Sequence, residues 1–260
     1  FRINKQREKY NEVNQSQTNE INENLRKQID ELDKRRKVVY TCILGEYDKM
    51  YSPLVITDNT DYIVYTDNNE LIKGLKYWKL RPIPENIKQI CNNNPVLINR
   101  YFKMHPNEFF EEYDYALYID GSIRVISDIT ELFTKINPKT GIGLHKHGKR
   151  KNVYEEAERC IEIKRGNAKE IKKQIEKYKK EKFPENFGLF EATVIAIDLN
   201  NENSNKLFKL WWDELIKSNT LRDQIVLPYI MWKNDYKYED IGILGEEITT
   251  NPKFKRLNHI

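Results

Sequence analysis

One carboxylate, placed where a buried strand ends, constrains this chain more than any other feature. The apolar, aromatic-rich run from Tyr115 to Ile119 predicts a buried β-strand, and it stops abruptly at Asp120-Gly121-Ser122. A charge at such a position is costly unless a cation, a metal ion or a ligand compensates it. Because ligands gather at the carboxyl ends of strands in open α/β sheets, Asp120 marks a candidate binding site. Asp-Gly is also a frequent hairpin signal, so a simple turn stays open as the alternative.

Short β-runs alternate with helical segments along most of the chain. We expect strands at 38–44, 62–65, 77–80, 115–119, 123–126, 141–145 and 192–199, and helices at 95–104, 128–133, 153–164, 168–180, 205–217 and 222–231. This alternation predicts an α/β domain of three layers around a mostly parallel central sheet. Residues 236–260 show no regular pattern and are expected to be irregular.

A polar segment precedes this domain. Residues 5–36 hold no Gly or Pro, and Ile21, Leu25 and Leu32 give a thin apolar stripe at helical spacing. The pattern predicts a solvated helix that serves as a linker, with a weak coiled coil or a stalk as the alternatives. Through it the chain could self-associate or meet a neighbouring domain. We therefore divide the chain into a helix at 1–36 and a globular domain at 37–260.

Composition excludes several classes of protein. The chain has 44 Lys and Arg residues and 40 Asp and Glu residues. Residues 1–37 contain ten of the basic residues and seven of the acidic ones. The remaining 34 and 33 leave the main domain nearly neutral, without the broad positive surface of a nucleic-acid-binding protein. The three cysteines show no CxxC spacing and fit neither a zinc knuckle nor a disulfide framework. No apolar run is long enough to span a bilayer. The first residue is Phe, so we expect a fragment of a larger cytoplasmic or membrane-associated protein.

Further polar side chains fall at predicted strand ends. Asp67 follows the run at 62–65, and in a parallel sheet it would face the same rim as Asp120, where a nucleotide's ribose and phosphates bind. A carboxylate suits ribose hydroxyls because it accepts two hydrogen bonds in fixed geometry. Arg100 and Lys103 lie three residues apart on one helix face. They would either neutralise a diphosphate or remain surface cations, as most Lys and Arg do.

Two more carboxylates and an arginine lie in loops that would converge on this rim. Glu191 precedes the run at 192–199, and Asp223 starts a helix beside Arg222. Asp at a helix start is often only a cap or a dipole partner, which leaves both interpretations of Asp223 open.

Familiar catalytic motifs give little further guidance. The chain has no HExxH, P-loop, GxGxxG or GxSxG sequence, so metalloprotease, Walker NTPase, dinucleotide-binding and serine hydrolase interpretations lack support. His145 and His147 alternate along an extended segment and point to opposite faces, so they do not easily chelate one metal ion together. Either one faces the cleft or both lie in a polar loop.

Segments spread over residues 37–232 match a known family in order. They are Val39–Asp48, Tyr65–Asp67, Arg100–Pro106, Tyr113–Tyr115, Tyr118–Arg124, His145–Arg150, Val153–Glu156, Phe183–Pro184, Gly188–Glu191, Trp211–Trp212 and Arg222–Gln224. On these residues the chain resembles the DUF616 family, the glycosyltransferase-like domain of TOD1/MUCI70 proteins. The resemblance does not cover the N-terminal helix.

The resemblance implies a GT-A-like, Rossmann-type fold and a nucleotide-sugar-dependent transferase. Such an enzyme moves a sugar from a nucleotide diphosphate sugar, most simply a UDP-sugar, to a hydroxyl of a glycan or another acceptor in polysaccharide or glycoconjugate synthesis. Asp120-Gly121-Ser122 falls where GT-A enzymes carry an Asp-x-Asp motif that holds Mn²⁺ or Mg²⁺ against the donor diphosphate. Ser122 replaces the second Asp and is a poorer ligand for a hard cation. His259 is the implied C-terminal metal ligand beside Asp120.

The resemblance also implies roles for individual residues. If the enzyme inverts, Asp223 or Glu191 is the general base that deprotonates the acceptor hydroxyl, and if it retains, the same groups orient the substrates. Arg222 belongs to the same catalytic group. A metal-dependent hydrolase that uses water in this cleft and a non-catalytic glycan-binding module are the alternatives. The implied donor contacts are Thr41, Asp67, Arg100, Lys103, Asp120, Ser122 and His145.

Overall fold

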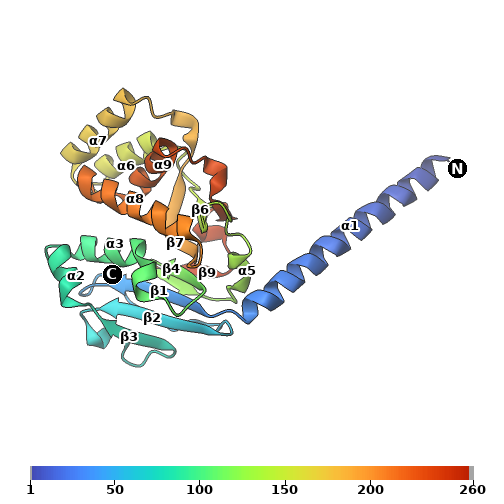
Figure 1. The fold of residues 1–260 in the computed structure, drawn as a ribbon, viewed down its shortest axis with the longest axis horizontal. Coiled ribbons are helices and arrows are strands. Elements are labelled where there is room, and N and C mark those ends of the chain that lie inside the picture. The colour runs from blue at the N-terminus through green and yellow to red at the C-terminus, as the bar shows by residue number, and fades with distance from the viewer. Residues whose placement is uncertain (1, 258–260) are drawn as a thin grey trace.

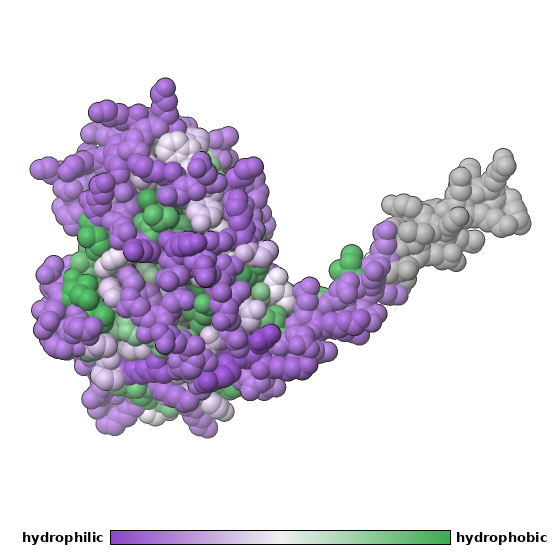
Figure 2. Space-filling view, in the orientation of Figure 1, coloured by the Kyte–Doolittle hydropathy of each residue, from purple (hydrophilic) through white to green (hydrophobic). Residues whose placement is uncertain are grey.

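The N-terminal helix projects from a single α/β domain (Figure 1). The computed structural model describes the backbone of residues 2–257 and the side chains of residues 17–257. Helix α1 (Arg2–Asp33) confirms the predicted polar helix, and its described surface is almost entirely hydrophilic (Figure 2). Among the described residues no helix is long and apolar enough to cross a membrane.

The C-terminal end of α1 is fixed to the domain by a buried lysine. Lys37 donates from Nζ to the carbonyl oxygens of Leu32, at 2.7 Å, and Arg35, at 3.0 Å. Leu32 belongs to the last turn of α1 and Arg35 lies just after it, so the ammonium group caps the end of the helix. Asp33 accepts a further hydrogen bond from Thr130 Oγ1 at 2.9 Å. The last turn of α1 is therefore part of the folded domain.

A seven-stranded sheet forms the centre of the domain, in the order β3-β2-β1-β4-β7-β6-β8. All the pairings are parallel except those of β7 with β4 and with β6, which confirms the predicted mostly parallel sheet. The strands are β1 (Lys37–Ile43), β2 (Thr60–Thr66), β3 (Trp78–Pro82), β4 (Tyr115–Ile119), β6 (Ile142–Lys146), β7 (Phe190–Asp198) and β8 (Gly242–Gly245).

The two faces of the sheet are covered by different layers, as the alternation of β1 illustrates. Val38 and Tyr40 pack into the core with the larger helices, whereas Val39 packs into the second core with α5 and a two-stranded β5–β9 sheet. These elements complete the predicted three layers. The helices are α2 (Glu85–Ile90), α3 (Pro95–Met104), α4 (Pro106–Phe109), α5 (Thr130–Phe133), α6 (Val153–Glu162), α7 (Ala168–Lys180), α8 (Glu202–Ser218) and α9 (Asp223–Lys233), and the outer strands are β5 (Ile123–Val125) and β9 (Phe254–Arg256).

The C-terminal segment differs from the expectation of an irregular tail. β8 extends the main sheet by pairing with β6, and β9 pairs with β5. Both strands are very short, so they carry too few residues to show a period. The strand predicted at 123–126 is present as β5, but it belongs to the small sheet rather than the main one.

Replacing Gly242 by alanine is expected to destabilise this edge of the sheet. A Cβ at Gly242 would lie 1.8 Å from the backbone oxygen of Lys135, which no side-chain rotation can relieve. We expect a loss of about 3 kcal/mol in the free energy of unfolding, measured by urea denaturation. Gly245→Ala in the same strand is the control, since its Cβ would meet its nearest atom at 3.4 Å, an ordinary contact. Equal effects of the two substitutions would contradict the steric explanation.

Candidate active site

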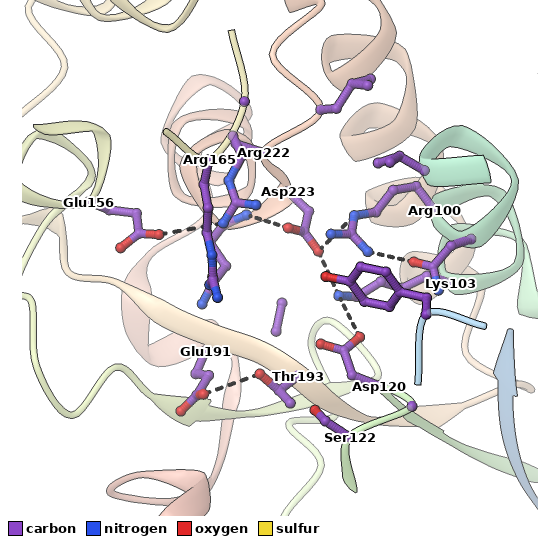
Figure 3. A pocket seen from close by; sticks show the side chains of 18 of the residues that line it. Arg100, Lys103, Asp120, Ser122, Glu156, Arg165, Glu191, Thr193, Arg222 and Asp223 are labelled. Carbon is purple, nitrogen blue, oxygen red and sulfur yellow. Dashed lines mark hydrogen bonds and ion pairs between the residues drawn. The ribbon is translucent and has the colours of Figure 1, made fainter. Parts of the chain in front are cut away.

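A cavity of about 1090 Å³ lies at the carboxyl ends of β1 and β4, against the start of α3. Its other walls come from the loop after β6, helix α6, the turn between α6 and α7, and the start of α9. Asp120 therefore opens into a cavity at the edge where α/β sheets bind ligands. Figure 3 shows the side chains of some of the residues that line it.

Asp120 is the first member of a network of charged groups. Its Oδ1 accepts a hydrogen bond from the Tyr118 hydroxyl at 2.9 Å and lies 3.8 Å from Nζ of Lys103. Lys103 donates to Oδ2 of Asp223 at 2.6 Å, and Nε of Arg100 lies 3.3 Å from the same oxygen. The Lys103 side chain is 1% exposed and that of Asp120 is 35% exposed. Asp120 thus offers its carboxylate to the cavity while buried groups hold it in place (Figure 3).

Asp223 is placed to hold cations rather than to accept a proton. Burial alone would raise its pKa, but Arg100, Lys103 and Arg222 hold the pKa well below its usual range. An efficient general base needs a pKa near the working pH. The carboxylate at the start of α9 therefore positions Lys103 and Arg100, while its predicted role as base stays a prediction.

A second charged cluster surrounds Glu156 on α6, whose side chain is 3% exposed. Nε of Arg150 donates to Oε2 of Glu156, and an NH2 nitrogen of Arg222 lies 3.8 Å from Oε1. His147 Nε2 is 3.9 Å from Oε2, and burial is the main cause that lowers the pKa of this imidazole. Two guanidinium groups thus share one buried carboxylate next to Asp223.

Glu191, at the start of β7, is a further carboxylate in the cavity lining. Its Oε1 accepts from Thr193 Oγ1 at 3.2 Å and lies 3.1 Å from NH1 of Arg256. The side chain is 12% exposed, and Thr193 lines the cavity beside it. Of the two predicted bases, Glu191 has the more exposed side chain, at 12% against 4% for Asp223.

A sequence model of the family described as TOD1/MUCI70, glycosyltransferase-like domain, matches residues 8–244. The chain belongs to this family. The match begins inside α1, so the expectation that the resemblance leaves out the N-terminal helix is wrong. No curated protein matches the chain.

Several solved structures of sugar transferases are similar to this TOD1/MUCI70 family chain. The bifunctional glycosyltransferase WbbM is 13% identical over 81% of the chain, with a TM-score of 0.46, and the chain spans 39% of its length. Mouse xyloside xylosyltransferase 1 is 11% identical over 76% of the chain and 82% of its own, with a TM-score of 0.44. The galactosyltransferase LgtC was solved with donor and acceptor sugar analogues. It is 12% identical over 75% of this chain and 70% of its own, with a TM-score of 0.45.

Within this family member the structure brings most of the predicted site residues to one cavity and leaves three of them out. Asp67 is exposed beside the loop after β1, where its Oδ1 accepts from the Gly45 backbone at 2.7 Å. Thr41 and His145 are buried inside the sheet. None of these three lines the cavity, whose lining includes Arg100, Lys103, Asp120, Ser122, Glu191, Arg222 and Asp223. His259 lies outside the described residues.

His145 was expected to contact the donor, but it lies in the interior. Its side chain is fully buried, and Nε2 is 2.9 Å from Nδ2 of Asn251 in the C-terminal segment. Burial, with a smaller contribution from Lys135, lowers the pKa of His145 to about 4. The residue therefore fastens the end of the chain to β6. The prediction failed because a strand-end residue can point into either layer of the sandwich.

His145 should make folding stability depend on pH in mildly acidic solution. Its folded pKa is about 4 and the unfolded reference is 6.5. The contribution of neutral His145 to the unfolding free energy is fully present above pH 6.5. It is lost as the pH falls toward the folded pKa, because the unfolded chain takes up the proton first. Between pH 7 and 4.5 we expect wild type to lose about 2.5 kcal/mol of unfolding free energy that His145→Gln does not lose. Urea denaturation at both pH values measures it, and parallel pH profiles would contradict it.

The described residues do not fit a divalent cation at Asp120. In residues 17–257 no group of three His, Cys, Asp or Glu side chains is placed to hold a metal ion. Ser122 stands where a second carboxylate would be needed, and Lys103 Nζ already lies 3.8 Å from Asp120 Oδ1. A hard cation prefers several oxygen ligands, and the ammonium group would repel it. The reaction proposed below therefore uses no metal ion.

Residue-by-residue interpretation of the sequence missed the cluster around Glu156. Glu156, Arg150 and Arg165 line the cavity from separate elements. The segments His145–Arg150 and Val153–Glu156 were among those that matched the family, which was a signal of their importance. Nothing in their sequence distinguished buried charges from solvated ones. Asp48 was missed as well: it lines the cavity, and a Cβ at Gly121 would lie 2.7 Å from its Oδ2, so this carboxylate packs on the Gly121 backbone next to Asp120.

Proposed function

We propose that this chain transfers a sugar from a nucleotide diphosphate sugar to a hydroxyl group of a glycan or another acceptor. Membership of a glycosyltransferase-like family supports this proposal. The observation that carries it is the network at the end of β4, where the partly exposed Asp120 lies 3.8 Å from the buried ammonium of Lys103. One cavity thereby presents both a hydrogen-bond acceptor for hydroxyl groups and fixed positive charge for phosphates.

The charges suggest how a donor would lie. Asp120 accepts hydrogen bonds from hydroxyls of the ribose or of the transferred sugar, because a carboxylate would repel phosphate. The diphosphate lies against the cations of the same cavity, which include Arg100 and Lys103. The cavity volume of about 1090 Å³ is at the upper end of the range for a single small ligand. The room that remains suits an acceptor beside the donor.

We assign the acceptor side of the reaction to Glu191. The acceptor oxygen forms a bond to the anomeric carbon, the bond from that carbon to the phosphate oxygen breaks, and the nucleoside diphosphate leaves with the bonding electron pair. The proton of the acceptor hydroxyl passes to the Glu191 carboxylate. Arg256 and Thr193, at 3.1 and 3.2 Å from its Oε1, hold this group in position.

A panel of nucleotide sugars tests the proposal. The full chain is incubated with each sugar, with and without glycan acceptors, and glycosylated product and free sugar are measured by mass spectrometry. We expect acceptor-dependent product from one donor class, and its loss in Glu191→Gln. Free sugar released at a catalytic rate without any acceptor would instead indicate a hydrolase. Binding without turnover of any donor would indicate a glycan-binding module.

A further inference from the structure

The cavity carries more positive than negative side chains. Its lining holds eight Lys and Arg and six Asp and Glu. The excess of positive side chains lies on the wall made by the loop after β6, helix α6 with the turn that follows it, and the start of α9. There Lys149, Arg150, Arg165 and Arg222 outnumber the two buried carboxylates of Glu156 and Asp223. This wall is therefore an anion-binding surface inside the candidate active site.

Arg165 and Arg222 are held next to each other by the turn that follows α6. The backbone N–H of Arg165 donates to the carbonyl of Cys160 at 2.8 Å, and Gly166 adopts a φ of +93°. A Cβ at Gly166 would lie 3.4 Å from Cδ of Arg222, so the turn packs on the stem of that side chain. In Figure 3 both guanidinium groups lie between Glu156 and Asp223.

Neither guanidinium group is fully partnered by the protein. Arg165 is exposed and forms no ion pair within residues 17–257. Nε of Arg222 is buried with no hydrogen-bond acceptor among the described residues. Its NH2 nitrogen lies 3.8 Å from Oε1 of Glu156, a carboxylate that Arg150 also uses. An unsatisfied buried donor costs free energy. A ligand with several anionic oxygens would remove that cost.

We propose that Arg165 and Arg222 bind the donor diphosphate and take the place of a divalent cation there. This inference rests on the proposed function, since it requires a nucleoside diphosphate to bind in the cavity. Glu156 and Arg150 act as positioning residues that fix Arg222, while Asp223 fixes Lys103 and Arg100 on the other side. The diphosphate thus lies between two groups of permanently charged side chains.

The chemistry of guanidinium groups suits this task. Each presents a planar set of N–H donors that matches two phosphate oxygens, and it remains charged at every physiological pH. Fixed positive charges stabilise the negative charge that develops on a departing diphosphate, which is the work that a metal ion does in other transferases. Ser122 in place of a second Asp is then compatible with donor binding.

Calorimetric titration of UDP, GDP and ADP into the full chain, in EDTA and in Mn²⁺, tests this inference. We expect one nucleotide to bind in EDTA with a Kd within about threefold of its value in Mn²⁺. Arg165→Gln and Arg222→Gln should each raise that Kd about 10- to 100-fold, since hydrogen bonds to charged groups are strong. The same substitutions should raise the Kd of the corresponding nucleoside monophosphate by a smaller factor. Arg26→Gln is the control, because Arg26 is exposed on α1 and does not line the cavity.

Three outcomes would overturn the inference. Binding that Mn²⁺ strengthens tenfold or more, with the gain lost in His259→Ala, would restore the metal site and leave nucleotide-sugar use standing. Unchanged affinity in both Arg165→Gln and Arg222→Gln would place the diphosphate elsewhere. The absence of binding for every nucleotide in either buffer would overturn the proposed function itself. Arg165 is exposed, so its variant is expected to fold normally and keeps the test decisive if Arg222→Gln does not.

Discussion

Asp120→Asn should reduce kcat/KM for sugar transfer by about 100-fold or more. Hydrogen bonds to a charged group contribute about 1.5–3 kcal/mol each, and two such bonds from donor hydroxyls correspond to at least this factor. Asparagine keeps the shape of the side chain and can still accept one bond, so the loss reports the charge. Steady-state kinetics with the preferred donor and acceptor measure the ratio.

The folding of the variant separates this effect from a structural one. The Asp120 side chain is 35% exposed, so its charge is partly solvated and its loss should change the unfolding free energy by about 1 kcal/mol or less. Asp213→Asn, on the exposed surface of α8, is the matched control and should leave both quantities unchanged. Full activity of Asp120→Asn would remove the carboxylate from the site and with it the placement of the donor.

The sequence predicts the layers well because they depend on periodicity. Long amphipathic segments such as α7 and buried runs such as β4 match their predicted bounds, and the alternation of the two element types indicates the parallel sheet. Short elements lack a full period. β8 and β9 lie in a segment expected to be irregular, and only their pairing with β6 and β5 makes them strands.

The candidate site was predictable where it follows from strand ends. Asp120 is such a residue, because the end of a parallel strand fixes which edge of the sheet a side chain occupies. A shift of one residue along a strand moves a side chain from one layer to the other. His145 was expected to face the cavity, but its position on β6 directs it into the interior. Burial decides the remaining roles. Asp223 and Glu156 read as ordinary helix-start and helix-surface acids, and only the packing of α9 and α6 shows that each holds two cations.

Asp223→Ala is expected to have the largest effect on stability. The change leaves the ammonium of Lys103, 1% exposed, without its partner at 2.6 Å and close to the Arg100 guanidinium. Removing one member of a buried ion pair costs about 3–5 kcal/mol, a large part of the stability of a typical domain. Urea denaturation at pH 7 measures this loss. Lys103→Met should restore part of it in the double variant, because the uncompensated charge is then removed.

The pH dependence of this pair distinguishes a positioning role from a basic one. Because the pKa of Asp223 is held well below its usual range, its contribution is present above the unfolded pKa near 4 and is lost only as the pH falls further. The stability difference between wild type and Asp223→Ala should therefore stay constant from pH 8 to 5. Asp213→Asn again serves as the control. A difference that changes across this interval would show that Asp223 titrates within it and would contradict the positioning role.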